Sequence, residues 1–203
     1  VEKNLALHLN TLLEMVKSIF STEEVQKNAD IHVINNFMMD RLRSYLKEIN
    51  GVVYSSEEIE AVLVNCGGNI TKLPEKLAAV RTFSEMPIAA DLAGANKRIS
   101  NILKKNELTI PDHVDESLLH APAEQLLFQQ MVTLTPSIDQ AIAQDDFKKS
   151  LQLLAQFSQA VNAFFADVMV NDPDLKLRTN RLALLHQLHQ QMSRVADLSQ
   201  LAK

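Results

Sequence analysis

Residues 164–172 read FFADVMVND, and residues 175–188 read LKLRTNRLALLHQL. The first stretch completes one apolar helical pattern, and the second begins the next. Residues 171–173, Asn-Asp-Pro, are typical of a tight turn, so the two stretches predict a helical hairpin. Such a hairpin needs the apolar residues and the turn, but it does not need the cluster of basic residues that follows directly after them.

The composition predicts an all-α fold. The chain has 203 residues, of which 46% are hydrophobic, so it can bury the core of one large domain or of two small ones. Four glycines, no tryptophan and abundant Leu, Ala, Gln and Lys favour helix over sheet, and no segment alternates convincingly with a period of two. We expect a helical body region over residues 1–86, followed by a helical bundle over residues 87–203.

The ends of the helices can be placed from apolar spacing, capping patterns and prolines. Apolar residues recur at helical spacing over residues 5–19 and 31–45. The capping-box pattern Ser55-x-x-Glu58 predicts a short helix that ends at Gly67 and Gly68. The other expected helices run over about 74–85, 87–105, 122–136, 145–170 and 174–200, with a break or kink at Pro136 and a loop over 106–121.

Charged residues are distributed unevenly along the chain. The formal net charge of −5 argues against a generally basic nucleic-acid binder. Residues 94–105 nevertheless contain four basic residues and no acidic one, and residues 175–196 contain no Asp or Glu. Residues 106–147, which lie between these segments, carry eight acidic residues and no Lys or Arg. The sequence therefore predicts a polarised surface with two basic helices and an acidic connector.

The basic residues of the two helices suggest different roles. In the helix expected over 87–105, the basic and polar residues gather opposite the expected apolar stripe, where lysines can attract phosphates. In the last helix, Arg181 falls on the apolar stripe itself, where an unpaired charge would be costly. We expect Asp167 to pair with it as a structural ion pair. Arg178 and Asn180 lie off that stripe, and their planar groups suit unpaired RNA bases.

The order and spacing of several stretches resemble a known family. LAGANKRISNIL at 92–103, FFADVMVND, and RTNRLALLHQLHQQMSRVADLSQL at 178–201 look like the C-terminal part of the β subunit of bacterial glycyl-tRNA synthetase. That part of the family is related to the helical, DALR-type anticodon-binding domain of arginyl-type synthetases. The resemblance covers essentially the whole chain, because FMMDRLRSYL at 37–46 and EEIEAVL at 57–63 fit the same subunit.

The resemblance implies a function for the chain. In that family an α₂β₂ ligase joins glycine to tRNA(Gly) with ATP and Mg²⁺. Its α subunit carries the adenylation site, and its β subunit supplies most of the tRNA binding. The chain would then be the anticodon-recognising portion of a longer polypeptide, partnered by tRNA(Gly) and the α subunit, with no cofactor of its own. Together with the charge pattern, this gives the RNA-binding candidates Asn96, Lys97, Arg98, Asn101, Lys104, Lys105, Lys176, Arg178 and Asn180.

No catalytic or metal-binding constellation is recognisable in the sequence. It contains no Gly-rich phosphate loop, G-x-S-x-G elbow or H-E-x-x-H motif. His186 and His189 could form half a metal site, but they have no carboxylate or cysteine partner nearby in sequence. Cys66 is the single cysteine, which fits a reducing compartment and, with the resemblance, the bacterial cytoplasm. We therefore expect no catalytic residue and no metal ligand in this chain.

One alternative function of a different class remains open on the sequence. The basic faces could dock an acidic partner subunit, which would make the chain a helical protein-interaction module. An independent enzyme is the weakest reading, because a catalytic constellation is missing. No apolar run approaches the roughly 18 residues that span a membrane, so we expect no membrane partner. We expect no DNA partner either. The start of the chain, VEKNLALHLN, reads as the middle of a helix.

Overall fold

The structure, a computed structural model, describes residues 8–19, 30–66 and 70–202. Apart from one small two-stranded hairpin, the regular elements of these residues are helices, which confirms the predicted all-α class. None of the described helices is both long and apolar enough to cross a membrane. The helices are α1 (Leu9–Ile19), α3 (Ile31–Leu46), α4 (Ser56–Leu63), α5 (Leu73–Ser84), α6 (Ala89–Lys104), α7 (Pro122–Ala143), α8 (Phe147–Ala155), α9 (Ser158–Asp167) and α10 (Leu175–Met192), with short 3-10 turns η1 (Glu116–Leu118) and η2 (Leu198–Leu201).

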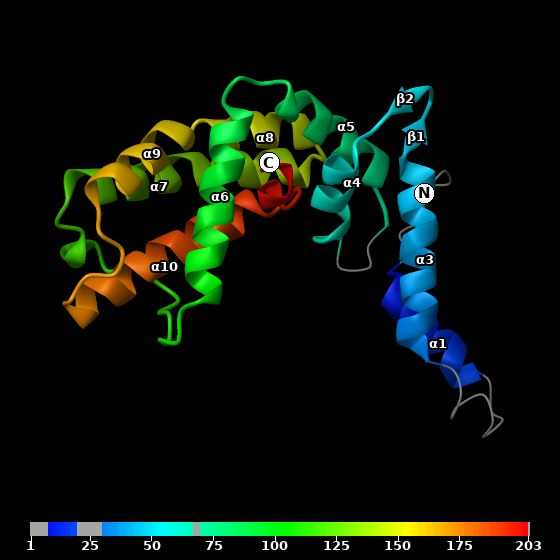
Figure 1. Cartoon of the computed structure of the whole chain (residues 1–203), viewed down its shortest axis with the longest axis horizontal. Helices are drawn as coiled ribbons and strands as arrows, with labels where there is room; N and C mark the ends of the chain where they lie inside the picture. The colour runs from blue at the N-terminus through cyan, green and yellow to red at the C-terminus, as the bar shows by residue number, and fades with distance from the viewer. Residues whose placement is uncertain (1–7, 20–29, 67–69, 203) are drawn as a thin grey trace.

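The helices after residue 86 form a bundle with α6 laid across it. α7 packs against α8 and α9, and α6 crosses α10 at a steep angle (Figure 1). After α10 the chain turns back, so that η2 packs between α6 and α4. α1 and α3 contact each other and extend from the rest of the molecule as an arm (Figure 1).

The hydrophobic core crosses the boundary that we predicted at residues 86 and 87. One cluster of buried side chains runs from Leu42 to Leu198 without interruption. α5 packs on α8, and α4 packs on η2, so two helices of the expected body region share their core with the bundle. The division into 1–86 and 87–203 stays a prediction, and the two parts are tightly packed together.

Local interactions explain the short elements around residue 50. The capping box is present, because the Ser55 hydroxyl accepts from the backbone N–H of Glu58 and the Glu58 carboxylate accepts from that of Ser55. Just before it lies a small antiparallel hairpin of β1 (Glu48–Ile49) and β2 (Val52–Val53), which the sequence analysis missed. Asn50 and Gly51 both have positive φ, as the tight turn of such a hairpin requires.

Three expected helix boundaries need correction, and two others cannot be compared with the structure. Of the break or kink expected at Pro136, the break does not occur: α7 continues to Ala143, because its packing along α8 and α9 outweighs the lost hydrogen bond. The helix expected over 145–170 is two helices, separated at Gln156 and the fully buried Phe157. The last helix ends at Met192, because the chain bends to bury the apolar residues that follow it. Residues 5–7, Gly67 and Gly68 lie outside the described residues.

A buried ion pair fixes the start of α10 against α7. Arg181 donates from Nε to Glu124 and from Nη1 to Asp172 and to the carbonyl oxygen of Met169. The Arg181 side chain is 9% exposed and that of Glu124 is fully buried. Burial alone lowers the pKa of Arg181, but the two carboxylates more than offset this and raise it. Asp167 as the partner of Arg181 is therefore wrong, and that residue is exposed near the end of α9.

The buried pair predicts a large stability effect at Glu124. Glu124→Gln keeps the size of the side chain but removes the charge that faces a buried guanidinium. We expect a loss of about 3 kcal/mol in the free energy of unfolding, because Asp172 still partly compensates Arg181. Chemical denaturation of both proteins measures it. Asp167→Asn, the same change at an exposed carboxylate, is the control, and equal effects of the two variants would contradict the assignment.

Candidate nucleic-acid interface

The sequence of α6 separates an apolar face from a basic one. Leu92 and Ile99 are fully buried against the bundle, as their helical spacing predicts. The other side of the helix is exposed over its last two and a half turns. The exposed polar residues on that side are Lys97, Arg98, Asn101, Lys104 and Lys105.

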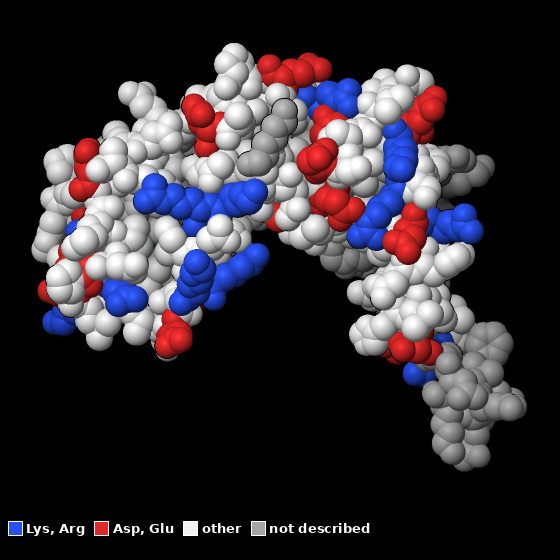
Figure 2. All heavy atoms as spheres, in the orientation of Figure 1, with Lys and Arg blue, Asp and Glu red and all other residues white. Residues whose placement is uncertain are grey.

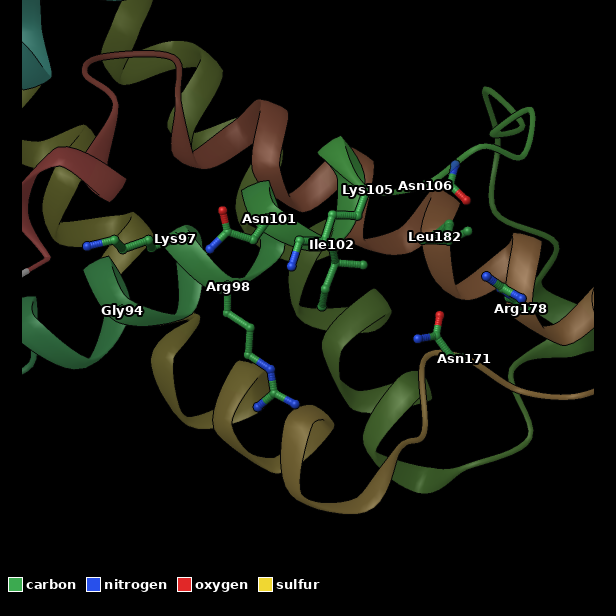
Figure 3. A pocket seen from close by; sticks show the side chains of 10 residues that line it. All are labelled: Gly94, Lys97, Arg98, Asn101, Ile102, Lys105, Asn106, Asn171, Arg178 and Leu182. Carbon is green, nitrogen blue, oxygen red and sulfur yellow. The ribbon is translucent and has the colours of Figure 1, made fainter.

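The basic part of α6 meets the start of α10 in an open pocket. Its volume is about 480 Å³, within the range of common ligand sites. Two apolar side chains, Ile102 and Leu182, contribute to its lining, and polar groups come from three separate segments. Figure 3 shows Arg178 and Asn171 on one side of this space and the side chains of α6 on the other. The polar lining residues are Lys97, Arg98, Asn101, Lys105, Asn106, Asn171 and Arg178.

The lining side chains differ in how far the fold already uses them. Lys97 donates to the backbone carbonyl of Ala202 at 3.2 Å. The Asn106 side chain donates to the backbone carbonyl of Leu108 and accepts from its N–H. Arg178 is half-buried, and its Nε is shielded from water without a hydrogen-bond partner among the described residues. A buried donor without a partner is costly. Among the described residues that line the pocket, Arg178 is therefore the one with a buried side-chain donor that lacks a hydrogen-bond partner.

Positive charge gathers around this pocket although the chain as a whole is acidic. Lys and Arg side chains cover the region where α6 crosses the bundle, and few acidic side chains lie between them (Figure 2). Lys104 is exposed on α6, and Lys176 is exposed in the first turn of α10. Neither lines the pocket, so they contribute to its surroundings by their charge alone.

Asn180 has a structural role, which corrects its prediction as an RNA-binding residue. Its side chain is 4% exposed. Its carbonyl oxygen accepts from the backbone N–H of Asp115 at 2.7 Å, and its amide group donates to the Asp115 carbonyl at 3.0 Å. These two bonds tie the acidic connector to α10. Because both groups of the amide are engaged away from the surface, Asn180 cannot read a base in this conformation.

Asn96 is likewise buried and belongs to the core rather than to the exposed basic face of α6. It is fully buried on α6, and its Oδ1 lies 2.8 Å from Nδ1 of His189 on α10. The contact holds the two crossing helices together. The pKa of His189 is lowered, first by burial and then by His186 and Lys104, although Asp197 opposes this. His189 is therefore a neutral interhelical residue, not half of a metal site.

The lowered pKa of His189 predicts a loss of stability in mild acid. In the unfolded chain a histidine takes up a proton near pH 6.5, but in the folded chain His189 does so only at lower pH. Its contribution to stability is therefore complete above about pH 6.5 and is lost as the pH falls towards the folded pKa. Urea unfolding between pH 8 and pH 5 measures this. His189→Gln should show a shallower decline than the original chain, and parallel curves would contradict the assignment.

No group of three or more His, Cys, Asp or Glu side chains that could hold a metal ion occurs within residues 8–19, 30–66 and 70–202. His186 contacts Gln190, its neighbour one turn along α10, at 2.9 Å. Cys66 is a buried free thiol. These residues are thus accounted for by packing and local hydrogen bonds. The chemistry of the pocket is that of lysine ammonium groups, amides and the two guanidinium groups of Arg98 and Arg178.

The pocket lies within a segment that matches a known domain. Residues 92–199 match the model of the DALR anticodon binding domain, which includes α6, the connector and α10. The chain belongs to the DALR anticodon binding domain family. Its basic pocket is therefore formed by the first and last helices of the DALR match.

The chain is also similar over its whole length to parts of longer proteins. It is 43% identical over 201 residues to the glycine–tRNA ligase beta subunit of Methylobacillus flagellatus, a match of 99% of this chain. It is 45% identical over 202 residues to that of Leptothrix cholodnii and 44% identical over 202 residues to that of Ralstonia nicotianae, each across the full chain. The chain spans about 28% of the length of these relatives.

Some pocket residues of the DALR domain were not identified from sequence. The sequence places Asn171 in a tight turn and Asn106 at the start of a loop, and neither position by itself predicts a pocket. Leu182 gave no signal, because an apolar residue that lines a pocket looks like any core residue. The proximity of Asn171 to the basic start of α10 was the one usable sign.

Proposed function

We propose that the chain is the tRNA-binding, anticodon-recognising portion of the β subunit of glycyl-tRNA synthetase. The observation that carries the proposal is the pocket in which α6 and α10, both basic, meet within an anticodon-binding family domain. The names of the relatives support glycine as the amino acid and a β subunit as the parent protein.

The exposed lysines suit the phosphate backbone of the RNA. Lys97 and Lys105 line the pocket, and Lys104 lies beside them on the same exposed end of α6. An ammonium group attracts phosphates without regard to sequence, so these residues would contribute affinity and orientation. The acidic connector and the net charge of −5 would keep other surfaces of the chain away from RNA.

The interior of the pocket suits an unpaired base. Ile102 and Leu182 offer apolar surface for the face of a base, while Asn101, Asn171 and Arg178 offer hydrogen-bonding groups for its edge. All glycine codons begin with GG, so glycine anticodons share two cytosines. A cytosine presents an amino donor and two acceptors, which amide oxygens and a guanidinium can complement. Arg178 and Asn171 take the place that we predicted for Arg178 and Asn180.

The parent enzyme supplies the chemistry in this proposal. The resemblance assigns adenylation with ATP and Mg²⁺ to the α subunit of an α₂β₂ tetramer in the bacterial cytoplasm. This chain would then bring tRNA(Gly) to that assembly without a catalytic centre or cofactor of its own. A reducing compartment is compatible with the single buried thiol, Cys66.

Two substitutions separate phosphate attraction from base reading. Lys105→Ala should weaken binding of all tRNAs alike and reduce the salt dependence of log K by about one unit of slope at most. Arg178→Ala should instead weaken binding of tRNA(Gly) more than that of the same tRNA with an altered anticodon cytosine. Fluorescence anisotropy over a salt series measures both effects on the 203-residue chain.

Matched controls lie on the same or similar helices. Lys148→Ala removes an exposed lysine from α8, and Arg194→Ala removes an arginine just after α10 that pairs with Asp139 outside the pocket. Neither should change tRNA binding by more than a small electrostatic amount. If Arg178→Ala loses equally on both tRNAs, Arg178 is not a base reader. If Lys105→Ala and Arg178→Ala both leave tRNA binding unchanged, while an acidic α subunit still binds, the protein-docking function replaces this proposal.

A further inference from the structure

A second groove adjoins the basic pocket on the side of α9. Its volume is about 440 Å³, and α6 and α9 form its two walls. Arg98 lines this groove and also the first pocket, so it stands between the two. Figure 3 shows the Arg98 side chain extending away from Asn101 and Ile102. The groove is lined by Ala90, Asp91, Gly94, Ala95, Arg98, Asn162 and Phe165.

An aromatic ring holds the guanidinium of Arg98. Its Cζ lies 4.0 Å from the ring centroid of Phe165, over the face of the ring. Phe165 in turn packs edge to face with Phe164, at 5.5 Å between centroids and an interplanar angle of 78°. Phe164 is fully buried, so the stack is anchored in the bundle core. Arg98 itself is exposed, and one face of its guanidinium is directed away from the ring and is available to a ligand.

The α6 backbone is uncovered where Gly94 lines the groove. Gly94 lies in α6, and glycine inside a helix is destabilising relative to alanine. A Cβ at this position would meet nothing within 4 Å, so packing among the described residues does not demand glycine. With Ala90 and Ala95 beside it, Gly94 leaves the α6 backbone open to close approach.

The charges of the groove favour a base over a phosphate. Asp91, in the first turn of α6, contributes a carboxylate to the lining, which would repel a phosphate. The same carboxylate can accept from the exocyclic amino group of cytosine, adenine or guanine. Asn162 is exposed on the α9 wall and adds an amide.

We propose that the α6–α9 groove binds a second unpaired base, stacked on Arg98 and with its amino group turned towards Asp91. The proposal rests on the proposed tRNA-binding function and adds a nucleotide site to it. Neighbouring nucleotides of one loop would occupy the groove and the basic pocket on either side of Arg98. Phe165, which also lines the groove, then holds the guanidinium of Arg98 flat for the base.

The test is a double-mutant cycle between the protein and an RNA stem-loop with the glycine anticodon. Arg98→Lys keeps the charge but removes the planar group, and should weaken binding about tenfold, since base stacking is worth a factor of roughly five to a hundred or more. The loss should disappear for the RNA in which one particular loop base is replaced by an abasic site. Phe165→Leu should also weaken RNA binding, and this loss should disappear for the same abasic RNA. The circular dichroism of this variant should remain that of the folded chain.

Two further variants keep the outcome unambiguous. Arg41→Lys changes an arginine that also lies over a phenylalanine, Phe37, but on the distant arm, and should have no effect. Gly94→Ala should raise the melting temperature and yet weaken RNA binding, a combination that damage to the fold cannot produce.

The proposal would be overturned if Arg98→Lys did not weaken RNA binding, or if it weakened binding equally whichever loop base was replaced by an abasic site. In that case Lys105→Ala decides about the wider function. If it still reduces affinity and salt dependence, tRNA binding stands and only the second base site is wrong. If it also changes nothing, the tRNA-binding function itself fails.

Discussion

Arg181 is a buried cation held by carboxylates from two different segments, and the geometry of the basic pocket depends on it. Glu124 comes from the start of α7, while Asp172 and the carbonyl of Met169 come from the turn between α9 and α10. The same network thus fixes the first turn of α10, which carries Arg178, and the turn that carries Asn171. A buried guanidinium without these partners would be unfavourable by several kcal/mol, so the arrangement cannot relax easily. Structural and functional basic residues lie side by side here for different reasons.

The charge on the folded chain is arranged so that a molecule with net negative charge presents one basic region. Neither α6 nor α10 contributes an acidic side chain to the pocket where they meet. The side chain of Asn180 binds the backbone of Asp115 and so holds the acidic connector against α10. Lysines at the rim can attract a phosphate chain over a distance of about a Debye length, close to 10 Å. In the proposed tRNA-binding function, Arg178 and Arg98 would then act at contact, where planar groups distinguish a base from a phosphate. The division of labour follows from residue type as much as from position.

Sequence reasoning predicted the helices and the basic segments well, because both depend on local patterns. Periodicity placed α6, and the capping box placed α4. The same reasoning failed where tertiary packing overrides local preference: α7 continues through Pro136, and the chain breaks at Phe157 to bury that ring. It also predicted Asp167 as the partner of Arg181, whereas the structure shows Glu124 and Asp172. Glu124 is 57 residues away in sequence, and no periodic pattern reports such a contact.

The candidate site was predictable in composition but not in detail. Lys97, Arg98, Asn101, Lys105 and Arg178 do line one pocket, as their basic, acid-free surroundings suggested. Asn96 and Asn180 could not be separated from them by sequence, because an asparagine looks the same whether its amide faces solvent or a buried backbone group. Their burial became evident only from the crossing of α6 over α10 and the position of the connector.

A nuclease footprint of tRNA(Gly) tests the central claim most directly. The account predicts that the chain protects the anticodon loop, and that protection is lost when Lys105 and Arg178 are both replaced by glutamate while the helical content stays unchanged. Protection confined to other arms of the tRNA, or an anticodon footprint that survives this charge reversal, would contradict the claim that the α6–α10 pocket is the RNA-binding site.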